Sequence, residues 1–473
     1  MTFLAPPYLP ARWCLGLLGL LGLPELLACQ TDRAERRNAV EPSEPAPVLA
    51  PSSASAESEP PLPSASPASA RAGKPLTRPP EPLNVILITV EAWRADMPWA
   101  GYPRAMVPQL TQLVTQGVLW ENHRAVSSHT PQSLAALSSG RLPSTLYRDG
   151  AVFPTYSAEN VFLPELLQAK GIRTLGVQPD PQLARGKGFE QGFDVWESVA
   201  RGSASETSSA RAAAQLIELL GQAPNTGKQF FAWLHLDDPG DPYVPQPQQA
   251  SFGASARDRY DGELQLVDGA VGKLLDFARQ QSWWGRTAVI VTGDHGEAFG
   301  EHGMSQHGQE LWDVLLKTPL IIRAPGAQPT RLGAARSQID LAPTIVELMG
   351  LPRQAQHQGQ SLLPELYGAA AAARPALLFE LCEDVQNPEL RALIVGDEKL
   401  IVPHHAADER LFNLKSDPGE ERDLAESQSD RLRALAVRFE GLWSNVPSIE
   451  PHGGMKLRSG RLAQGPARPT PSP

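Results

Sequence analysis

The chain of 473 residues is poor in cysteine, and this scarcity limits what can hold it together. Two of its three cysteines, Cys14 and Cys29, lie near the N-terminus, so the rest of the sequence offers no disulfide framework. Nothing beside Cys382 in sequence would activate a thiol, and we interpret it as a lone thiol. Stability must come from a buried apolar core, which a chain of this length can form.

A basic block is also missing. The 42 Lys and Arg residues face 52 Asp and Glu residues, for a formal charge of −10. No cluster of positive charge stands out in the central region, so we expect no nucleic-acid partner. The apolar run from Trp13 to Leu23 is too short to cross a membrane as a helix.

That run fits the core of a secretory signal peptide instead. It ends in Leu26-Leu27-Ala28-Cys29, which resembles the lipobox of bacterial lipoproteins, whose cysteine is lipidated and becomes the mature N-terminus. We therefore expect residues 1–29 to be a lipoprotein signal peptide and Cys29 to anchor the chain to a membrane. An ordinary secretory leader with a chance cysteine is the alternative. The expected location is the bacterial cell envelope, where Gln30 favours the outer membrane, or else the periplasm or the exterior.

Composition divides the remaining chain into four parts. Residues 30–82 are rich in Pro, Ser and Ala and predict a disordered linker. In residues 83–375 strand-like and helix-like segments alternate, which indicates an α/β fold with helices on both faces of a mostly parallel sheet. Residues 376–448 predict a small antiparallel subdomain that contains a hairpin and ends in a helix near 429–443. Residues 449–473 predict a disordered tail.

The expected elements of the large domain follow from apolar runs and 3.6-residue periods. Strands are predicted at 84–90, 172–177, 229–235, 287–292 and 319–323. Helices are predicted near 107–117, 132–138, 159–169, 208–221, 262–281 and 341–349.

Chemistry-bearing residues follow two of these strands directly. Glu91 comes after residues 84–90, and Asp294 and His295 come after an apolar run at 287–291. Ligands bind at the carboxyl edge of open α/β sheets. Thr130 stands just ahead of a predicted helix. Two carboxylates, a hydroxyl and an imidazole could then converge on one metal ion.

Each of these residues also has a structural interpretation. Glu91 could be an acid at a helix N-terminus, where the helix dipole favours it. Thr130 followed by Pro131 is typical of a helix start, with Thr130 as the N-cap. Asp294 could cap a turn and leave His295 exposed. The order of the sites along the chain favours the metal interpretation.

Three further histidines are candidates for contact with a substrate. His302 and His307 lie in a glycine-rich loop after His295, and either could stabilise a substrate oxyanion or protonate a leaving group. Either could equally be an exposed loop histidine. His235 ends another apolar strand, and its possible roles range from substrate contact to core packing.

Several segments resemble the sulfatase branch of the alkaline-phosphatase superfamily, from Asn84 to about Ala425. The resembling segments are 84–96, 138–143, 188–194, 292–303, 318–326, 340–344 and 411–420. The resemblance implies an alkaline-phosphatase-like α/β sandwich with a mostly parallel central sheet, a small C-terminal antiparallel subdomain and a metal at the strand edge.

The departures from the family pattern concern the site. Thr130 stands where a typical sulfatase has the Cys or Ser that is oxidised to formylglycine, so no formylglycine is expected. Gln132 and Leu134 occupy the usual Pro and Arg positions. Glu91 replaces an Asp, and Ala92 stands where the next carboxylate is usual. Gly240 stands in the place of a substrate-contacting histidine. Thr130 makes the usual sulfate-ester mechanism doubtful.

The set of Glu91, Thr130, Asp294 and His295 is similar to that of phosphoethanolamine transferases and lipoteichoic-acid synthases, which hold Zn or Mn. We predict a metal-dependent hydrolase or transferase that acts on sulfate or phosphate esters with Thr130 as metal-bound nucleophile, and phosphoester or phosphotransfer chemistry is favoured. The expected cofactor is one divalent ion, Zn, Mn or Ca. The expected substrate is an anionic ester, with a glycan or a lipid as options. The alternative is a non-catalytic envelope binding protein of the same fold.

Overall fold

The computed structural model describes residue 79 and residues 81–200, 207–240, 242–243, 252–403 and 408–461. The predicted signal peptide, the lipidated Cys29 and nearly all of the linker at 30–82 lie outside these residues. Among the described residues, no helix has the length and apolar character needed to span a membrane.

The described chain is built on an eight-stranded sheet with the strand order β11-β2-β10-β7-β1-β6-β4-β5. Only β10 runs antiparallel to its neighbours, and the other pairs in this sheet are parallel. Its strands are β1 Asn84–Val90, β2 Val118–Trp120, β4 Arg173–Gln178, β5 Val195–Ser198, β6 Phe230–Leu236, β7 Thr287–Gly293, β10 Leu320–Arg323 and β11 Thr330–Leu332. Short two-stranded pairs are formed by β3 His123–Arg124 with β12 Arg336–Ser337 and by β8 Ala298–Phe299 with β9 Ser305–Gln306.

Strand β1 lies at the centre because almost all of its side chains are apolar. All seven residues of Asn84–Val90 are buried. Such a continuous apolar run suits a parallel strand that is covered on both faces. Alternate residues serve the two faces: Ile86 and Ile88 enter one core, whereas Val85 and Leu87 enter the other.

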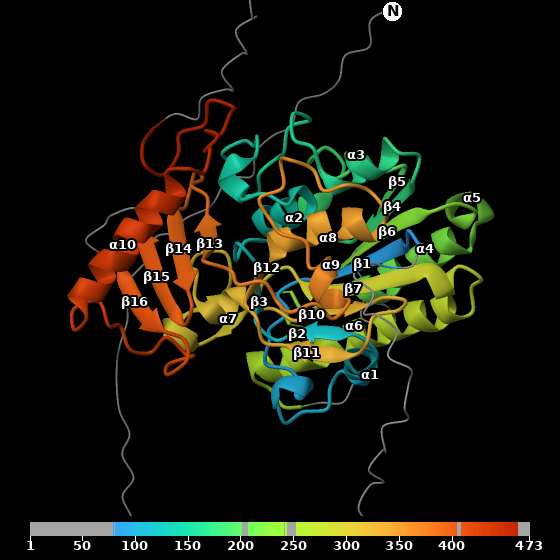
Figure 1. Cartoon of the computed structure of the whole chain (residues 1–473), viewed down its shortest axis with the longest axis horizontal. Coiled ribbons are helices and arrows are strands. Elements are labelled where there is room, and N and C mark those ends of the chain that lie inside the picture. The colour runs from blue at the N-terminus through green and yellow to red at the C-terminus, as the bar shows by residue number, and fades with distance from the viewer. Residues whose placement is uncertain are drawn as a thin grey trace, which may run out of the picture. The chain divides into compact units, whose positions relative to one another are not determined.

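Helices cover both faces of this sheet, as Figure 1 shows. One core contains residues of α1, α4 and α6, and the other contains residues of α2, α3 and α8. The helices are α1 Pro108–Gln116, α2 Thr130–Ser139, α3 Leu163–Gln168, α4 Ser208–Gly221, α5 Ala223–Thr226, α6 Ala256–Arg279, α7 Asp313–Leu316, α8 Leu341–Leu348, α9 Leu363–Leu366 and α10 Ser429–Trp443. The arrangement is the predicted α/β sandwich with a mostly parallel sheet.

A second, antiparallel sheet follows toward the C-terminus, with the order β13-β14-β15-β16. Its strands are β13 Leu377–Leu381, β14 Leu390–Val395, β15 Glu398–Pro403 and β16 Arg410–Asn413. Helix α10 covers this sheet through Leu435, Phe439 and Trp443, which share a core with residues of β14, β15 and β16. Figure 1 shows α10 alongside these strands.

The segment after α10 differs from the expectation of disorder. Ile449 N–H donates to the carbonyl of Ser144, and His452 N–H donates to that of Arg148. Arg461 forms an ion pair with Glu383 at 2.8 Å. For residues 449–461 the prediction of a disordered tail is therefore wrong, because backbone and ionic contacts compensate for the polar composition.

The long apolar strands were predicted to within about a residue, whereas the short strands β2, β5 and β11 near the two edges of the sheet were missed. Helix α6 begins earlier than expected, at Ala256, where Ser255 and Asp258 form a capping box. The prediction that Thr130 is an N-cap is wrong. His129 holds that position and Thr130 is the first helical residue, which frees its hydroxyl for another partner.

Candidate active site

The candidate site lies where three neighbouring strands end at the same level. Val90 is paired with Leu236 of β6 on one side and with Gly293 of β7 on the other. Glu91 and Asp294, the next residues of β1 and β7, are therefore brought to one edge of the sheet. The chain turns sharply after Glu91, since Ala92 has a φ of 52°. This left-handed backbone is unfavourable for a non-glycine residue, and such strain is found at functional sites.

The strained turn fixes the carboxylate of Asp294. Its Oδ1 accepts hydrogen bonds from the backbone N–H of Ala92 at 2.9 Å and of His295 at 2.7 Å. Its Oδ2 lies 3.5 Å from Nε2 of His295 and has no hydrogen-bond partner, although the residue is fully buried. Ser133 and Gln338 both donate to the Asp294 carbonyl. The backbone and side chain of Asp294 are thus held in place, while its Oδ2 remains available to bind a cation.

The imidazole of His295 meets the hydroxyl of Thr130. Its Nε2 lies 2.9 Å from Thr130 Oγ1, and its Nδ1 lies 2.8 Å from the carbonyl oxygen of Gly296. A carbonyl oxygen can only accept, so Nδ1 carries the proton and the lone pair of Nε2 faces Thr130. The hydroxyl of Thr130 therefore donates to His295. The same lone pair is the one that a metal ion would use.

Burial and mutual charge perturb these groups. Burial, with the charge of Glu91, raises the pKa of Asp294 to about 7. Burial, with the charge of His307, lowers the pKa of His295 to about 3 and keeps its imidazole neutral. Burial raises the pKa of Glu91, but the charge of His235, whose Nε2 lies 3.8 Å from Glu91 Oε2, outweighs it and brings the pKa to about 2. Strong perturbation of this kind is typical of functional sites.

The cluster fits a divalent metal ion. The donor atoms of Glu91 and His295 lie within 4.8 Å of one another, and Thr130 and Asp294 adjoin His295. Asp294 Oδ2 is buried without a hydrogen-bond partner. A bare buried carboxylate oxygen is costly, and a cation would remove that cost. Carboxylate, imidazole and hydroxyl donors suit Zn or Mn. The structure brings the four predicted ligands together, and their role as ligands stays a prediction.

His307 stands beside this cluster and is held by Glu297. Its ring centroid lies 4.2 Å from that of His295, and its Nδ1 lies 3.2 Å from Glu297 Oε2. Burial lowers the pKa of His307, but the hydrogen bond and charge of Glu297 outweigh it and raise the pKa to about 9. The imidazole is therefore protonated at neutral pH. It can supply a proton to a leaving group.

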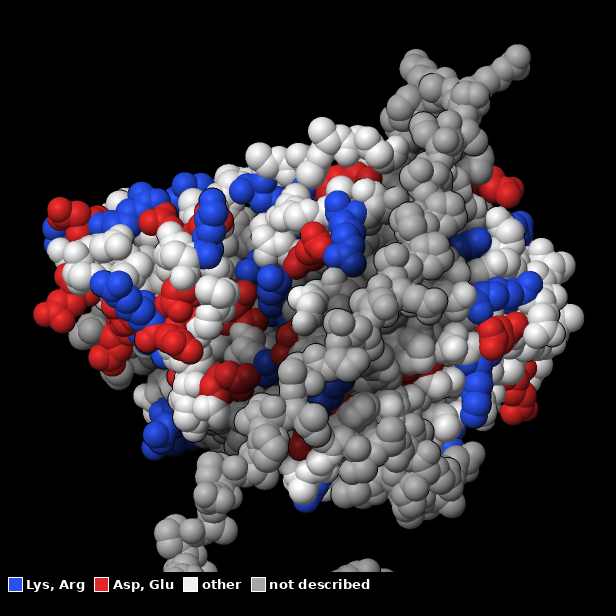
Figure 2. All heavy atoms as spheres, turned by 90° about the horizontal axis from the view of Figure 1, so that it is seen from below, with Lys and Arg blue, Asp and Glu red and all other residues white. Residues whose placement is uncertain are grey.

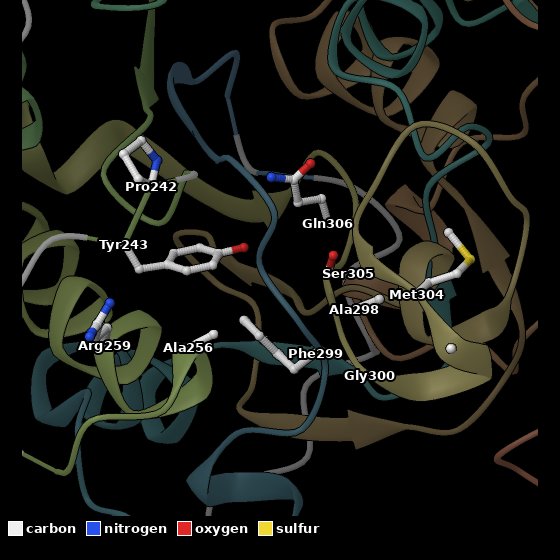
Figure 3. A pocket seen from close by; sticks show the side chains of 11 residues that line it. Pro242, Tyr243, Ala256, Arg259, Ala298, Phe299, Gly300, Met304, Ser305 and Gln306 are labelled. Atoms are coloured by element: carbon white, nitrogen blue, oxygen red, sulfur yellow. The ribbon is translucent and has the colours of Figure 1, made fainter. Parts of the chain in front are cut away.

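A hollow of roughly 520 Å³ has Gln306, the residue before His307, in its wall. Tyr243 connects this hollow to His307, because its hydroxyl donates to Glu297 at 2.5 Å and its ring lines the hollow. Figure 3 shows Tyr243 and Phe299 projecting into this space from separate segments, with Met304 farther along the wall. The lining mixes apolar and polar side chains, as is usual where a small molecule binds. The hollow is a candidate place for the organic part of a substrate.

The structure places His302 elsewhere. Its side chain is exposed, and its ring stacks on Trp312 with the centroids 3.7 Å apart. It lines a different hollow, together with Arg94, Glu301 and Lys317. The prediction that His302 shares the site with His307 is not supported by its contacts, because the loop turns at His302, where φ is 55°.

Sequence reasoning missed Asp180 and His129. Asp180 follows β4, caps the 3-10 turn Pro181–Leu183, and lies with Glu91 and His235 in a second group of potential ligands. Its position just after a strand is the signal that also marked Glu91. His129 is buried, and neither ring nitrogen has a hydrogen-bond partner. Burial lowers its pKa to about 3.

The exposed charges have a mixed distribution. Figure 2 shows acidic and basic side chains interspersed over the described part of one face. Inside the candidate site, by contrast, carboxylates gather around the neutral imidazole of His295 and the protonated one of His307.

Two family models match the chain. One described as Sulfatase matches residues 83–351, and one described as N-sulphoglucosamine sulphohydrolase, C-terminal, matches residues 300–438. N-acetylgalactosamine-6-sulfatase of Sus scrofa is 24% identical, with 77% of this chain and 86% of that protein aligned. Choline-sulfatase of Rhizobium meliloti (strain 1021) is 28% identical over 36% of this chain, and an uncharacterised sulfatase of Escherichia coli (strain K12) is 26% identical over 37%. These two matches span 33% and 34% of the bacterial relatives' own lengths.

Solved structures share the fold. The phosphonate monoester hydrolase of Agrobacterium radiobacter superposes with a TM-score of 0.67 at 19% identity, and covers 81% of this chain and all of its own. An enzyme bound to its substrate D-glucosamine-2-N,6-O-disulfate superposes with a TM-score of 0.66 at 16% identity, and covers 77% of this chain and 99% of its own.

Proposed function

Because this chain belongs to the sulfatase family, we propose that it is a metal-dependent hydrolase or transferase of phosphate or sulfate esters in which Thr130 is the nucleophile. One observation carries the proposal. The Thr130 hydroxyl lies 2.9 Å from His295 Nε2, and Asp294 Oδ2, which is buried without a hydrogen-bond partner, lies 3.5 Å from the same nitrogen.

The residues that would hold a divalent ion are Glu91, Thr130, Asp294 and His295. Such an ion supplies positive charge, which lowers the pKa of a nearby hydroxyl and offsets the negative charge of the ester oxygens. The protein's part is to orient the nucleophile. Thr130 is β-branched and sits in the first turn of the fully buried helix α2, so its hydroxyl has little freedom.

In the proposed first step, Thr130 Oγ forms a bond to the phosphorus or sulfur of the ester, and its hydroxyl proton passes to solvent. The bond to the leaving oxygen breaks with its electron pair, and that oxygen takes a proton from His307. In the second step, His307 takes a proton from water or an acceptor alcohol, whose oxygen bonds to the phosphorus or sulfur. The bond to Thr130 Oγ breaks with its electron pair, and Oγ regains a proton from solvent. Glu297 holds His307 throughout through the 3.2 Å contact.

Phosphoester chemistry is favoured over sulfate-ester chemistry. A formylglycine hydrate carries two hydroxyls on one carbon, whereas threonine carries a single hydroxyl. The ester on Thr130 must therefore be opened by attack at its central atom, as in covalent phosphotransfer. The shared fold with a phosphonate monoester hydrolase supports this direction.

The substrate and the location are proposed from the same evidence. The hollow lined by Tyr243 and Gln306 could take the organic part of an anionic ester, and a glycan is one option because a similar structure holds a sulfated glucosamine. A lipid ester is the other. A lipid anchor at Cys29 would place the domain at the surface of the bacterial envelope, with residues 30–82 as its tether.

The test is a side-by-side assay of the full chain loaded with Zn or Mn on aryl phosphate, phosphodiester, phosphonate monoester and aryl sulfate. Thr130→Ala should lower turnover by about 10³-fold or more. The matched control is Thr115→Ala, an exposed threonine of α1. A phosphoryl group trapped on the peptide that contains Thr130, seen by mass spectrometry, would identify the covalent intermediate.

The outcomes separate the candidate chemistries. Phosphoester turnover that disappears in Thr130→Ala supports the proposal. Sulfate turnover that disappears in the same variant keeps Thr130 as the nucleophile but rejects the preferred ester. Turnover that survives in Thr130→Ala rejects the nucleophile. A metal-loaded protein that binds an anionic ester without converting it would indicate the non-catalytic alternative.

A further inference from the structure

A second group of potential ligands lies on the β6 side of Glu91, and the proposed reaction uses neither Asp180 nor His235 of this group. The donor atoms of Glu91, Asp180 and His235 lie within 4.8 Å of one another, and all three residues are buried. His235 Nε2 is 3.8 Å from Glu91 Oε2. These residues come from the ends of β1, β4 and β6, which are adjacent in the sheet.

Each of the three side chains directs a polar atom that has no hydrogen-bond partner into this space. Glu91 Oε2, Asp180 Oδ2 and His235 Nε2 are all buried without a hydrogen bond. Their residues are 6%, 1% and 0% exposed. Buried polar atoms in proteins are almost always paired with protein, water or an ion. Three unpaired atoms that converge on one point indicate a missing ligand that can accept electron pairs from all of them.

The remaining atoms of these side chains are fixed by other contacts. Asp180 Oδ1 accepts the backbone N–H of Gln182 at 2.8 Å. His235 Nδ1 lies 2.9 Å from Thr89 Oγ1, which also accepts the indole N–H of Trp233 at 2.9 Å. A hydroxyl oxygen has two lone pairs, so it can accept from both. With Nδ1 as the donor to Thr89, Nε2 is the ring nitrogen directed at Glu91, and a metal ion bound there would displace its proton.

We propose that Glu91, Asp180 and His235 form a binding site for a second divalent cation of the Zn or Mn class, with Glu91 as the ligand shared by both ions. Two carboxylates and one imidazole are a usual donor set for such ions. Ligands about 2.1 Å from a tetrahedral ion lie about 3.4 Å apart, so the 3.8 Å separation of Glu91 and His235 requires little movement. The site shares Glu91 with the proposed reaction but does not depend on Thr130 as nucleophile.

The two ions would have different roles. The ion at His295 would adjoin the nucleophile. The ion at Asp180 would lie behind Glu91, away from Thr130, and would fix the orientation of the Glu91 carboxylate. A carboxylate that is held from behind presents its other oxygen to the first ion in a defined direction.

The test counts ions in the full chain. The protein is stripped with a chelator, titrated with Zn alone, separated from free metal and measured by elemental analysis. The wild type should hold about two Zn per chain, and Asp180→Asn and His235→Gln should each hold about one. His295→Gln should also hold about one, because it removes the other site. Glu380→Gln, which alters a buried carboxylate outside both groups, should still hold about two.

A measurement on the wild type alone covers the case in which a variant does not fold. Anomalous diffraction at the zinc absorption edge should show one peak between Glu91, Asp180 and His235 and another beside His295. A single peak beside His295, or an equal Zn content in wild type and Asp180→Asn, would overturn the proposal. If Thr130→Ala kept full activity and the protein still held two Zn per chain, the proposed function would be wrong but the second site would stand.

Discussion

The hydroxyl oxygen of Thr130 lies 2.9 Å from Nε2 of His295, although 165 residues separate the two in sequence. The contact joins the first turn of α2 to the end of β7. Since Nδ1 of His295 is committed to the Gly296 carbonyl, the hydroxyl has one defined partner. This pairing presents Thr130 as a nucleophile in a single orientation.

The first prediction concerns that orientation. Thr130→Ser keeps the hydroxyl but removes the methyl group that restricts χ1. We expect kcat to fall by about tenfold, far less than in Thr130→Ala, because the nucleophile remains and only its positioning is lost. Steady-state kinetics on the preferred ester would measure this. Equal loss in the Ser and Ala variants would show that the oxygen of residue 130 does not react.

The second prediction concerns the leaving group. His307→Gln removes the proton donor, so turnover of alkyl esters, whose leaving groups are poor, should fall by about 10²–10⁴-fold. In esters of 4-nitrophenol the phenolate leaves without protonation, so their turnover should fall by less than about tenfold. Rates for esters with a series of leaving groups would give the slope of log kcat against the pKa of the leaving group, in wild type and variant.

His302→Gln is the matched control for this series. It lies in the same loop but stacks on Trp312 and is exposed. Its kinetics should match the wild type on every ester. A leaving-group slope that changed in His302→Gln and not in His307→Gln would reverse the assignment.

The third prediction concerns stability and pH. Burial raises the pKa of Glu380 to about 7, and the charge of Glu389 adds to the effect, whereas the Ser144 backbone N–H and Arg148 oppose it. The folded chain therefore holds this proton more tightly than the unfolded chain does, near 4.5. The free energy of unfolding should fall as pH rises from about 4.5 to about 7 and should stay reduced above.

Glu380→Gln cannot ionise and should lack this fall. Between pH 5 and pH 8 the wild type should lose up to about 3 kcal/mol more than the variant does. Urea denaturation of both proteins at the two pH values would measure the difference. If the free energy of unfolding fell equally in both proteins, Glu380 would be ionised in the folded chain at pH 5 as well as at pH 8.

The fourth prediction concerns Gly296, whose carbonyl sets the tautomer of His295. A Cβ at Gly296 would lie only 2.1 Å from the backbone oxygen of Val314. Gly296→Ala must therefore shift the backbone, and we expect a loss of about 1–3 kcal/mol in stability together with weaker metal binding. Gly262→Ala in α6 meets nothing within 4 Å and should stabilise by up to about 1 kcal/mol. Thermal unfolding and Zn titration of both variants would test this.

The convergence of Glu91, Asp294 and Thr130 could be predicted because local sequence signals mark each of them. The two carboxylates follow long apolar strands, and the ends of parallel strands meet at one edge. Thr130 precedes Pro131 at a helix start. The family pattern gave the order of these sites, and the structure supplied the contact between Thr130 and His295.

Asp180 and His302 show where sequence reasoning stops. Asp180 stands between two prolines and has the pattern of a turn, and its approach to Glu91 depends on β4 pairing with β6 beside β1. His302 and His307 share a glycine-rich loop, and local sequence cannot decide which ring turns inward. The choice is made by distant residues, since Trp312 stacks on His302 and Glu297 holds His307.

The pairing of β1 with both β6 and β7 also decides when during folding the site can exist. Ala92 and Asp294, which are joined by a hydrogen bond, are 202 residues apart in sequence. Contacts across such a separation form slowly, because a long loop must close before they gain any stabilisation. A newly made chain would thus acquire its affinity for an ion at His295 only after β7 has joined β1, and that ion could not guide the earlier stages of folding.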